Sequence, residues 1–196
     1  TVALVGRTGC GKSTVARLLP RFYDVTDGSI LLDGTDIRDF LVEDLRTHIN
    51  VIPDEPFLFS ESVRNNIAFA RPDAQEEEVV AAAEAAQAAD FISDLTYGYE
   101  EIVGERGYTL SGGQRQRIVI ARTLLASPKI LILDDSTSSI DVETESDIHS
   151  SLKKLLRDRT TVVIAHRLSS ITLADRVILM DSGKVKAQGT HEYLLA

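Results

Sequence analysis

The sequence predicts an α/β fold: a parallel-sheet core covered by helices, a small β hairpin region, and an inserted helical subdomain. Three observations support this prediction. Short apolar runs alternate with amphipathic helical stretches, a glycine-rich turn joins the first run to the first helix, and a long middle section favours helix and contains no comparable strand. With 196 residues, the chain has the length of one domain, or of one domain with an inserted subdomain.

The expected strands are runs of four to five residues bounded by turn or helix signals. They are residues 2–5, 49–52, 130–133, 161–165 and 177–180. Helices are expected to begin near Gly11, Val142 and Leu168. A Leu-Leu-Asp-Gly-Thr turn within residues 28–40, flanked by residues that favour strands, predicts the hairpin. Residues 60–126 form the expected helical subdomain, because residues 75–95 are rich in alanine and glutamate.

Composition and charge exclude several classes of protein. The net charge is −9, and the first 98 residues hold 17 acidic against 8 basic side chains, so we expect no nucleic-acid partner. The single cysteine, Cys10, excludes an internal disulfide. The longest apolar run has five residues (79–83), far fewer than the roughly 20 of a membrane span. Because the chain opens directly on a core strand, we expect the sequence to begin inside a larger polypeptide.

The turn after the first strand matches the phosphate-binding pattern G-x-x-x-x-G-K-[ST], which is typical of a P-loop NTPase. Glycines let backbone N–H groups converge on phosphate oxygens, a lysine reaches the β- and γ-phosphates, and a hydroxyl ligates Mg²⁺. The sequence therefore predicts ATP and Mg²⁺ as cofactors. The predicted ATP-binding residues are Gly6, Arg7, Thr8, Gly9, Cys10, Gly11, Lys12, Ser13 and Thr14, with Ser13 also a metal ligand.

Two acidic residues, Asp134 and Asp135, end the apolar run 130–133. Adjacent carboxylates repel each other, so stability alone would not favour them. Open α/β sheets bind ligands at the carboxyl ends of their strands. Asp134 is therefore the predicted Mg²⁺ ligand, and Asp135 is placed to act on the attacking water.

At this point the motifs resemble those of the ATP-binding-cassette (ABC) ATPases. Leu110-Ser111-Gly112-Gly113-Gln114 is similar to the family's signature sequence, and Ser111 lies 99 residues after Lys12 and 23 before Asp134. The resemblance implies that two cassettes pack head to tail, so that each signature contacts the other cassette's ATP. It also implies roles for a D-loop and for a histidine that senses the γ-phosphate. The matching residues are Ser139 and Asp141 in the D-loop, and His166.

Two stretches narrow the resemblance to ABC exporters. Residues 103–107 resemble the exporter X-loop, and residues 56–67 resemble the segment that follows the exporter Q-loop. The resemblance implies that residues 1–196 are a nucleotide-binding domain that powers export. Its implied partners are a second ABC nucleotide-binding domain and a transmembrane domain of the same polypeptide, which would place it at the cytoplasmic face of the cell membrane.

Two positions depart from the family pattern. Asp135 stands where the family has the glutamate that acts as general base, and Asp54 stands where it has the Q-loop glutamine, here a further Mg²⁺ ligand and catalytic candidate. A shorter carboxylate at position 135 and an extra charge at position 54 predict ATP binding with slow hydrolysis. The chain then resembles the degenerate-site half of a heterodimeric exporter. The alternatives are a homodimeric exporter and an ABC-type ATP-binding module without a transport role.

The residues around the signature also predict a local structure. Ser111 suits the first position of a helix, and residues 116–126 should continue that helix. We expect Arg115, Arg117 and Arg122 to form a solvated or interface face of it.

Overall fold

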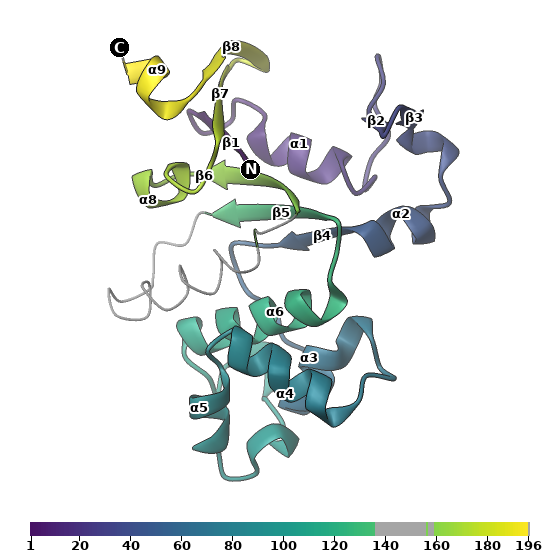
Figure 1. Cartoon of the computed structure of the whole chain (residues 1–196), viewed down its shortest axis with the longest axis vertical. Helices are drawn as coiled ribbons and strands as arrows, with labels where there is room; N and C mark the ends of the chain where they lie inside the picture. Colours follow the sequence, from purple (N-terminus) through teal and green to yellow (C-terminus); the bar gives the residue numbers. More distant parts are fainter. Residues whose placement is uncertain (136–155, 157–158, 196) are drawn as a thin grey trace. The chain divides into compact units, whose positions relative to one another are not determined.

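The computed structural model describes residues 1–135, 156 and 159–195, which divide into two compact units (Figure 1). The first unit contains Thr1–Val51 together with residues 128–135 and 159–195. The second contains Ile52–Ser127 and residue 156. The helix expected near Val142 and the D-loop residues Ser139 and Asp141 lie outside the described residues.

A mixed sheet forms the core of the first unit, and in the described chain its strand order is β4-β5-β6-β1-β7-β8. Strands β5, β6, β1 and β7 pair in parallel, and β8 pairs antiparallel to β7. The predicted α/β class and all five predicted strands are therefore confirmed. The bounds are β1 Val2–Gly6, β4 Ile49–Ile52, β5 Ile130–Asp135, β6 Thr160–Ala165, β7 Arg176–Asp181 and β8 Lys184–Gly189.

Strand β8 is an element that the sequence analysis did not predict. It follows β7 through Ser182 and Gly183, whose φ angles of 50° and 76° are both positive. Two positive φ values are the geometry of a type I′ turn, which matches the twist of antiparallel strands. The Ser-Gly pair between two strand-like runs was the available signal, but the second run is polar at most positions.

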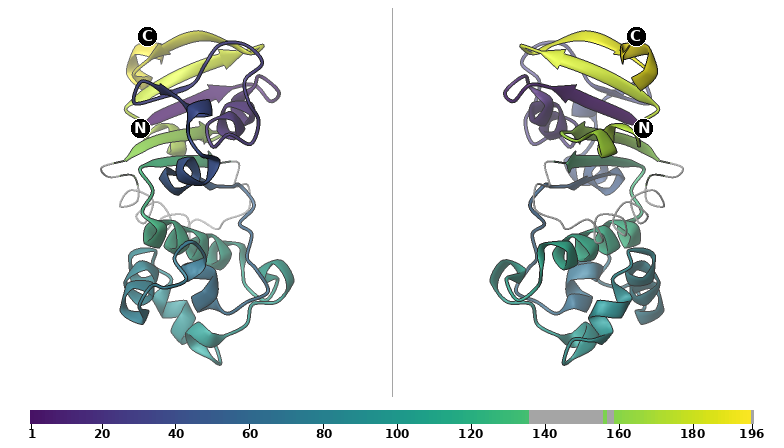
Figure 2. Two further views of the ribbon diagram at one scale, coloured as in Figure 1. Left: turned by 90° about the vertical axis from the view of Figure 1, so that its right-hand side faces the viewer. Right: turned by 90° about the vertical axis from the view of Figure 1, so that its left-hand side faces the viewer.

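Helices cover both faces of this sheet (Figures 1 and 2). Helices α1 (Lys12–Leu18) and α2 (Val42–His48) lie on one face, and α8 (Leu168–Ile171) lies on the other. Ala16 of α1 and Leu45 of α2 pack in one buried cluster with Ile132 of β5 and Ile164 of β6. Helix α9 (His191–Leu195) follows β8 at the end of the chain.

The predicted hairpin is present within residues 28–40. Strands β2 (Leu31–Leu32) and β3 (Thr35–Asp36) pair around Asp33 and Gly34, whose φ angles of 48° and 86° again fit a type I′ turn. The 3₁₀ turn η1 (Ile37–Asp39) follows β3 directly.

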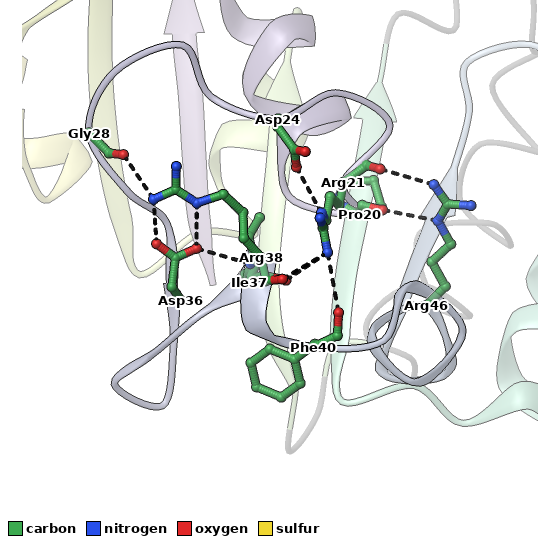
Figure 3. Close-up of polar contacts among 9 residues, drawn as sticks. All are labelled: Pro20, Arg21, Asp24, Gly28, Asp36, Ile37, Arg38, Phe40 and Arg46. Carbon is green, nitrogen blue, oxygen red and sulfur yellow. Dashed lines mark hydrogen bonds and ion pairs between the residues drawn. The ribbon is translucent and has the colours of Figure 1, made fainter.

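Arg21 attaches this hairpin segment to the chain that follows α1, Arg46 attaches α2 to the same place, and Arg38 makes its contacts within the segment (Figure 3). Arg21 donates from Nη1 to the carbonyl oxygens of Ile37, Arg38 and Phe40, and Arg46 donates to those of Pro20 and Arg21. Arg38 forms an ion pair with Asp36 at 2.6 Å. Its side-chain and backbone hydrogen bonds lower the pKa of Asp36 to about 2, so this pair persists across the physiological pH range.

Helices make up most of the second unit as described, where Ser62 and Ile102 form an isolated β-bridge. The Ala- and Glu-rich stretch 75–95 is two helices, because Gln87 adopts a φ of 55° between them. None of the described helices combines the length and the apolar character that crossing a bilayer requires. The elements are α3 Val63–Ile67, η2 Ala68–Ala70, α4 Glu76–Ala85, α5 Ala89–Ser93, η3 Gly98–Glu100, η4 Glu105–Gly107 and α6 Gly112–Ala126.

Candidate ATP-binding site

The P-loop joins β1 to α1 and requires glycine at its two ends. Gly6 has a φ of 153°, and a Cβ there would collide with the carbonyl oxygen of Met180 and lie 2.7 Å from Sγ of Cys10. Gly11 precedes α1 with a φ of 105°, in the region that side-chain-bearing residues rarely adopt. The first backbone N–H groups of a helix have no partner within it. The glycines therefore allow a tight turn that presents these amides.

Lys12 extends back over this loop. Its side chain is buried, and Nζ donates to the carbonyl oxygens of Gly6 at 2.8 Å and Arg7 at 3.2 Å. Ser13 and Thr14 are exposed at the start of the helix. A buried ammonium beside exposed amides and hydroxyls is a donor set that fits a phosphate chain. The P-loop residues predicted from the sequence thus form one continuous cradle.

The P-loop is held in place by contacts of Cys10 that the sequence did not predict. Cys10 packs with Leu4 and Met180 in a buried cluster, and its carbonyl oxygen accepts a hydrogen bond of 3.1 Å from the N–H of Gly183. The β7–β8 turn therefore stabilises the P-loop through this hydrogen bond. Cys10 is a small core residue whose thiol lies 3.9 Å from Lys12 Nζ.

Alkylation of Cys10 is expected to abolish nucleotide binding. Because the thiol is 4% exposed and touches the space around Gly6 and Lys12, an added group would displace both. The expected result is slow modification by N-ethylmaleimide, with ATP binding lost in proportion to the modified fraction measured by mass spectrometry. The control is a Cys10→Ala variant, which should bind ATP with or without the reagent. Full ATP binding after complete modification would contradict this prediction.

The carboxyl ends of three neighbouring parallel strands bring further predicted residues to one edge of the sheet. Gly6 ends β1, Asp134 and Asp135 end β5, and His166 follows β6. Within the β5–β6 pairing, Asp134 lies opposite Ile164 and Asp135 opposite Ala165. Asp134 is half-buried and His166 is exposed. This edge therefore holds the P-loop together with oxygen and nitrogen groups suited to Mg²⁺ and phosphate.

The signature residues lie in the second unit, at the start of α6. Ser111 Oγ accepts a hydrogen bond of 3.2 Å from the N–H of Gln114, and Gln114 Oε1 accepts one of 2.9 Å from the N–H of Ser111. This is a capping box, and it confirms Ser111 as the residue that caps the helix. The hydroxyl uses only an acceptor site here, so its O–H can still donate to an anion.

Asp54 also belongs to the second unit, where it is half-buried in the segment after β4. The first unit therefore brings together the P-loop, Asp134, Asp135 and His166. The second unit contains Asp54 and the four signature residues.

The three arginines of α6 do not form the expected solvated face. Each is half-buried and donates to backbone carbonyl oxygens inside the second unit, so the expected solvated face is wrong, and the interface face stays a prediction. Arg115 donates to Leu110 at 2.6 Å, Arg117 to Gln87 at 2.9 Å, and Arg122 to Asn66 at 2.7 Å. Sequence patterns could not show this, because the acceptors are main-chain atoms.

Comparison with known proteins identifies the family. The family model described as "ABC transporter" matches residues 1–138. The chain belongs to the ABC transporter family. The predicted resemblance and P-loop NTPase class are therefore confirmed, and the chain is an ABC-type ATP-binding domain.

Individual relatives are similar over the whole chain. "Putative multidrug export ATP-binding/permease protein YgaD" of Bacillus subtilis is 53% identical over 195 residues, which cover 100% of this chain and 34% of that protein. A Staphylococcus aureus protein with the same descriptive name is also 53% identical, over 196 residues, with the same coverage. This ABC domain thus spans about a third of the length of these relatives.

A solved structure gives the same result for the fold. "Structure of a bacterial Atm1-family ABC exporter with ATP bound" superposes with a TM-score of 0.92 at 47% identity, covering 99% of this chain and 34% of that one. The exporter resemblance predicted from residues 56–67 and 103–107 therefore agrees with both comparisons.

Proposed function

We propose that this ABC domain binds ATP with Mg²⁺ in its P-loop and, together with a second ABC nucleotide-binding domain, drives export of a substrate across a membrane. The observation that carries the proposal is the buried Lys12 ammonium, held over the P-loop at the sheet edge that also bears Asp134. The similarity to proteins named as export ATP-binding/permease proteins supports the transport role.

Each predicted site residue in the first unit has a chemical role in this proposal. Lys12 and the loop amides would hold the phosphates, and the Ser13 hydroxyl and the Asp134 carboxylate would hold a Mg²⁺ ion, which supplies positive charge to neutralise the phosphates. His166 is exposed beyond β6, where its imidazole can donate to the γ-phosphate. Asp135 is the base that would take a proton from the attacking water.

Hydrolysis at this site is proposed to be slow. Asp135 is one methylene shorter than glutamate, which withdraws its carboxylate by about 1 Å, and a displacement of that size costs on the order of a hundredfold in rate. The resemblance gives Asp54 the role of the Q-loop glutamine in the metal shell, and there a carboxylate in place of a neutral amide would repel the triphosphate. Both changes impair turnover more than ATP binding.

The comparisons support one of the two proposed partners, the transmembrane domain. Because the relatives are about three times longer and are named ATP-binding/permease proteins, we propose a transmembrane domain in the same polypeptide. The ABC domain would then work at the cytoplasmic face of the cell membrane. Its intact signature (Ser111, Gly112, Gly113 and Gln114) would contact ATP bound to a different, fully active cassette, as in a heterodimeric exporter.

A tagging experiment tests this assignment. Two copies of the full-length protein with different tags are co-expressed and purified through one tag in MgATP. A heterodimer predicts that the second tag is absent and that the isolated protein hydrolyses ATP slowly. Efficient recovery of the second tag would instead support a homodimeric exporter. A protein that binds ATP but neither pairs with any cassette nor hydrolyses ATP in single-turnover reactions would be a non-transport module.

A further inference from the structure

Three phenylalanines form a partly exposed cluster in the segment that follows Asp54. The rings of Phe59 and Phe69 stack at 4.3 Å, and Phe57 meets Phe59 edge-on at 5.1 Å. Phe57 is 46% exposed and Phe69 55%. We call Phe57, Phe59 and Phe69 the aromatic cluster. It belongs to the exporter-like segment 56–67 and to η2, which follows that segment.

Arg122 connects this cluster to α6, whose first turn carries the signature. Its Nε donates to the Asn66 carbonyl oxygen at 2.7 Å, its Nη2 to Asn66 Oδ1 at 2.9 Å, and its Nη1 to the Phe57 carbonyl oxygen at 3.2 Å. The guanidinium carbon also lies 5.6 Å from the Phe59 ring centre and 5.7 Å from that of Phe69. All three guanidinium nitrogens and both ring contacts thus face one short segment.

The side chain of Asn66 holds residues 59–62 in place beside the guanidinium of Arg122. It is fully buried, and its Nδ2 donates to the carbonyl oxygens of Phe59, Glu61 and Ser62 at 3.0 to 3.3 Å. Its Oδ1 also accepts from the N–H of Phe59 at 2.9 Å. Residues 59–62 are therefore tied to α3 through one amide, and Arg122 binds that same amide.

Burying the charged guanidinium of Arg122 costs free energy, which indicates that its role is to fix the positions of its hydrogen-bond partners. Burial lowers the pKa of Arg122 to about 10, and among the described residues its polar partners are main-chain and amide oxygens. Burying a cation without a carboxylate is unfavourable, so a simple packing role would be served better by an apolar side chain. A planar guanidinium that binds three acceptors at once can hold α6 and residues 57–69 in a fixed relative position.

We infer that Arg122 is a positioning residue that joins the aromatic cluster to the signature helix, so that ATP contact at Ser111 and movement of residues 57–69 occur together. The inference rests on the proposed function, in which the signature contacts a partner's ATP. It adds the specific link between that contact and the segment following Asp54.

Hydrogen exchange measured by mass spectrometry tests this link on the full-length protein purified together with the cassette that it pairs with, because the signature contacts ATP only in that complex. The variant is Arg122→Lys, which keeps the charge but loses the planar guanidinium. The matched control is Arg117→Lys on the same helix, because Arg117 also donates to a carbonyl oxygen and lies 4.8 Å from a ring centre, that of Phe91. In the wild-type protein, MgATP should slow exchange by about threefold or more in residues 57–69 and in residues 110–115.

Arg122→Lys should retain the MgATP effect at residues 110–115 and lose it at residues 57–69, while Arg117→Lys should retain both. Three results would overturn the inference. The first is an unchanged MgATP effect at residues 57–69 in Arg122→Lys, and the second is an equal loss of that effect in Arg117→Lys. The third is a wild-type protein in which MgATP slows exchange in only one of the two segments or in neither. If the wild-type P-loop residues 6–14 also fail to respond, the proposed ATP binding is wrong. If Arg122→Lys does not fold, Arg122→Met is measured, because an apolar chain of similar length avoids a poorly placed buried charge.

Discussion

Lys12→Ala is expected to reduce ATP affinity by about a hundredfold or more and to abolish hydrolysis. Hydrogen bonds to charged groups contribute about 1.5–3 kcal/mol each, and the ammonium would serve two phosphates, so a loss of about 3 kcal/mol corresponds to that factor. In the structure, this ammonium is already buried over the loop and bound to the carbonyl oxygens of Gly6 and Arg7. Equilibrium binding of a fluorescent ATP analogue, with and without Mg²⁺, measures the effect.

Arg17→Ala is the matched control for this experiment. Arg17 lies on the same helix, is exposed, and its removal changes the net charge by the same amount. It should bind ATP within about twofold of wild type, because screened charges beyond the site contribute little. Equal losses in the two variants would show that bulk charge, and not the P-loop lysine, determines affinity. Thermal unfolding of each variant separates lost binding from lost structure.

Asp135→Glu is expected to raise ATP hydrolysis by about ten- to a hundredfold with little change in ATP affinity. The added methylene returns the carboxylate by about 1 Å towards the distance of 2.6–3.2 Å at which a general base can accept a proton. Phosphate release from the full-length protein, under single-turnover and steady-state conditions, gives the rate. Adding Asp54→Gln should raise it further, because a neutral amide removes repulsion from the triphosphate.

Asp181→Glu controls for the insertion of a methylene alone. Asp181 ends β7 of the same sheet, as Asp135 ends β5, and it is exposed. This substitution should leave the hydrolysis rate unchanged. If Asp135→Glu also leaves it unchanged, or if the wild-type protein already hydrolyses ATP rapidly, the slow-site assignment is wrong.

The sequence was sufficient for those parts of the fold that depend on local pattern. The five expected strands, the P-loop and the Asp33–Gly34 hairpin were predictable, because each has a periodicity or a turn chemistry that needs no distant partner. The break of residues 75–95 at Gln87 was not, because a glutamine with positive φ has no local signal. Strand β8 was missed because its residues are mostly polar and it needs only β7 as a neighbour.

In the candidate site, too, local motifs were predictable and long-range contacts were not. Lys12, Asp134 and Ser111 were found because their motifs fix residue type at fixed spacing. The hydrogen bond from Gly183 to Cys10 and the bonds from Arg122 to the carbonyl oxygens of Phe57 and Asn66 were not predictable, because each has a main-chain acceptor far away in sequence. Their acceptors are carbonyl oxygens, which every residue carries, so no side-chain pattern could mark them.

The capping box at the start of α6 has a consequence for how this domain can change over generations. Ser111 and Gln114 satisfy two backbone donors of their own helix, so losing either side chain would weaken the fold by about 1 kcal/mol before any nucleotide is considered. Selection for a folded protein alone would therefore retain both residues. A descendant whose neighbouring cassette had ceased to turn over could keep this sequence as a relic of transport, preserved by the helix that it begins.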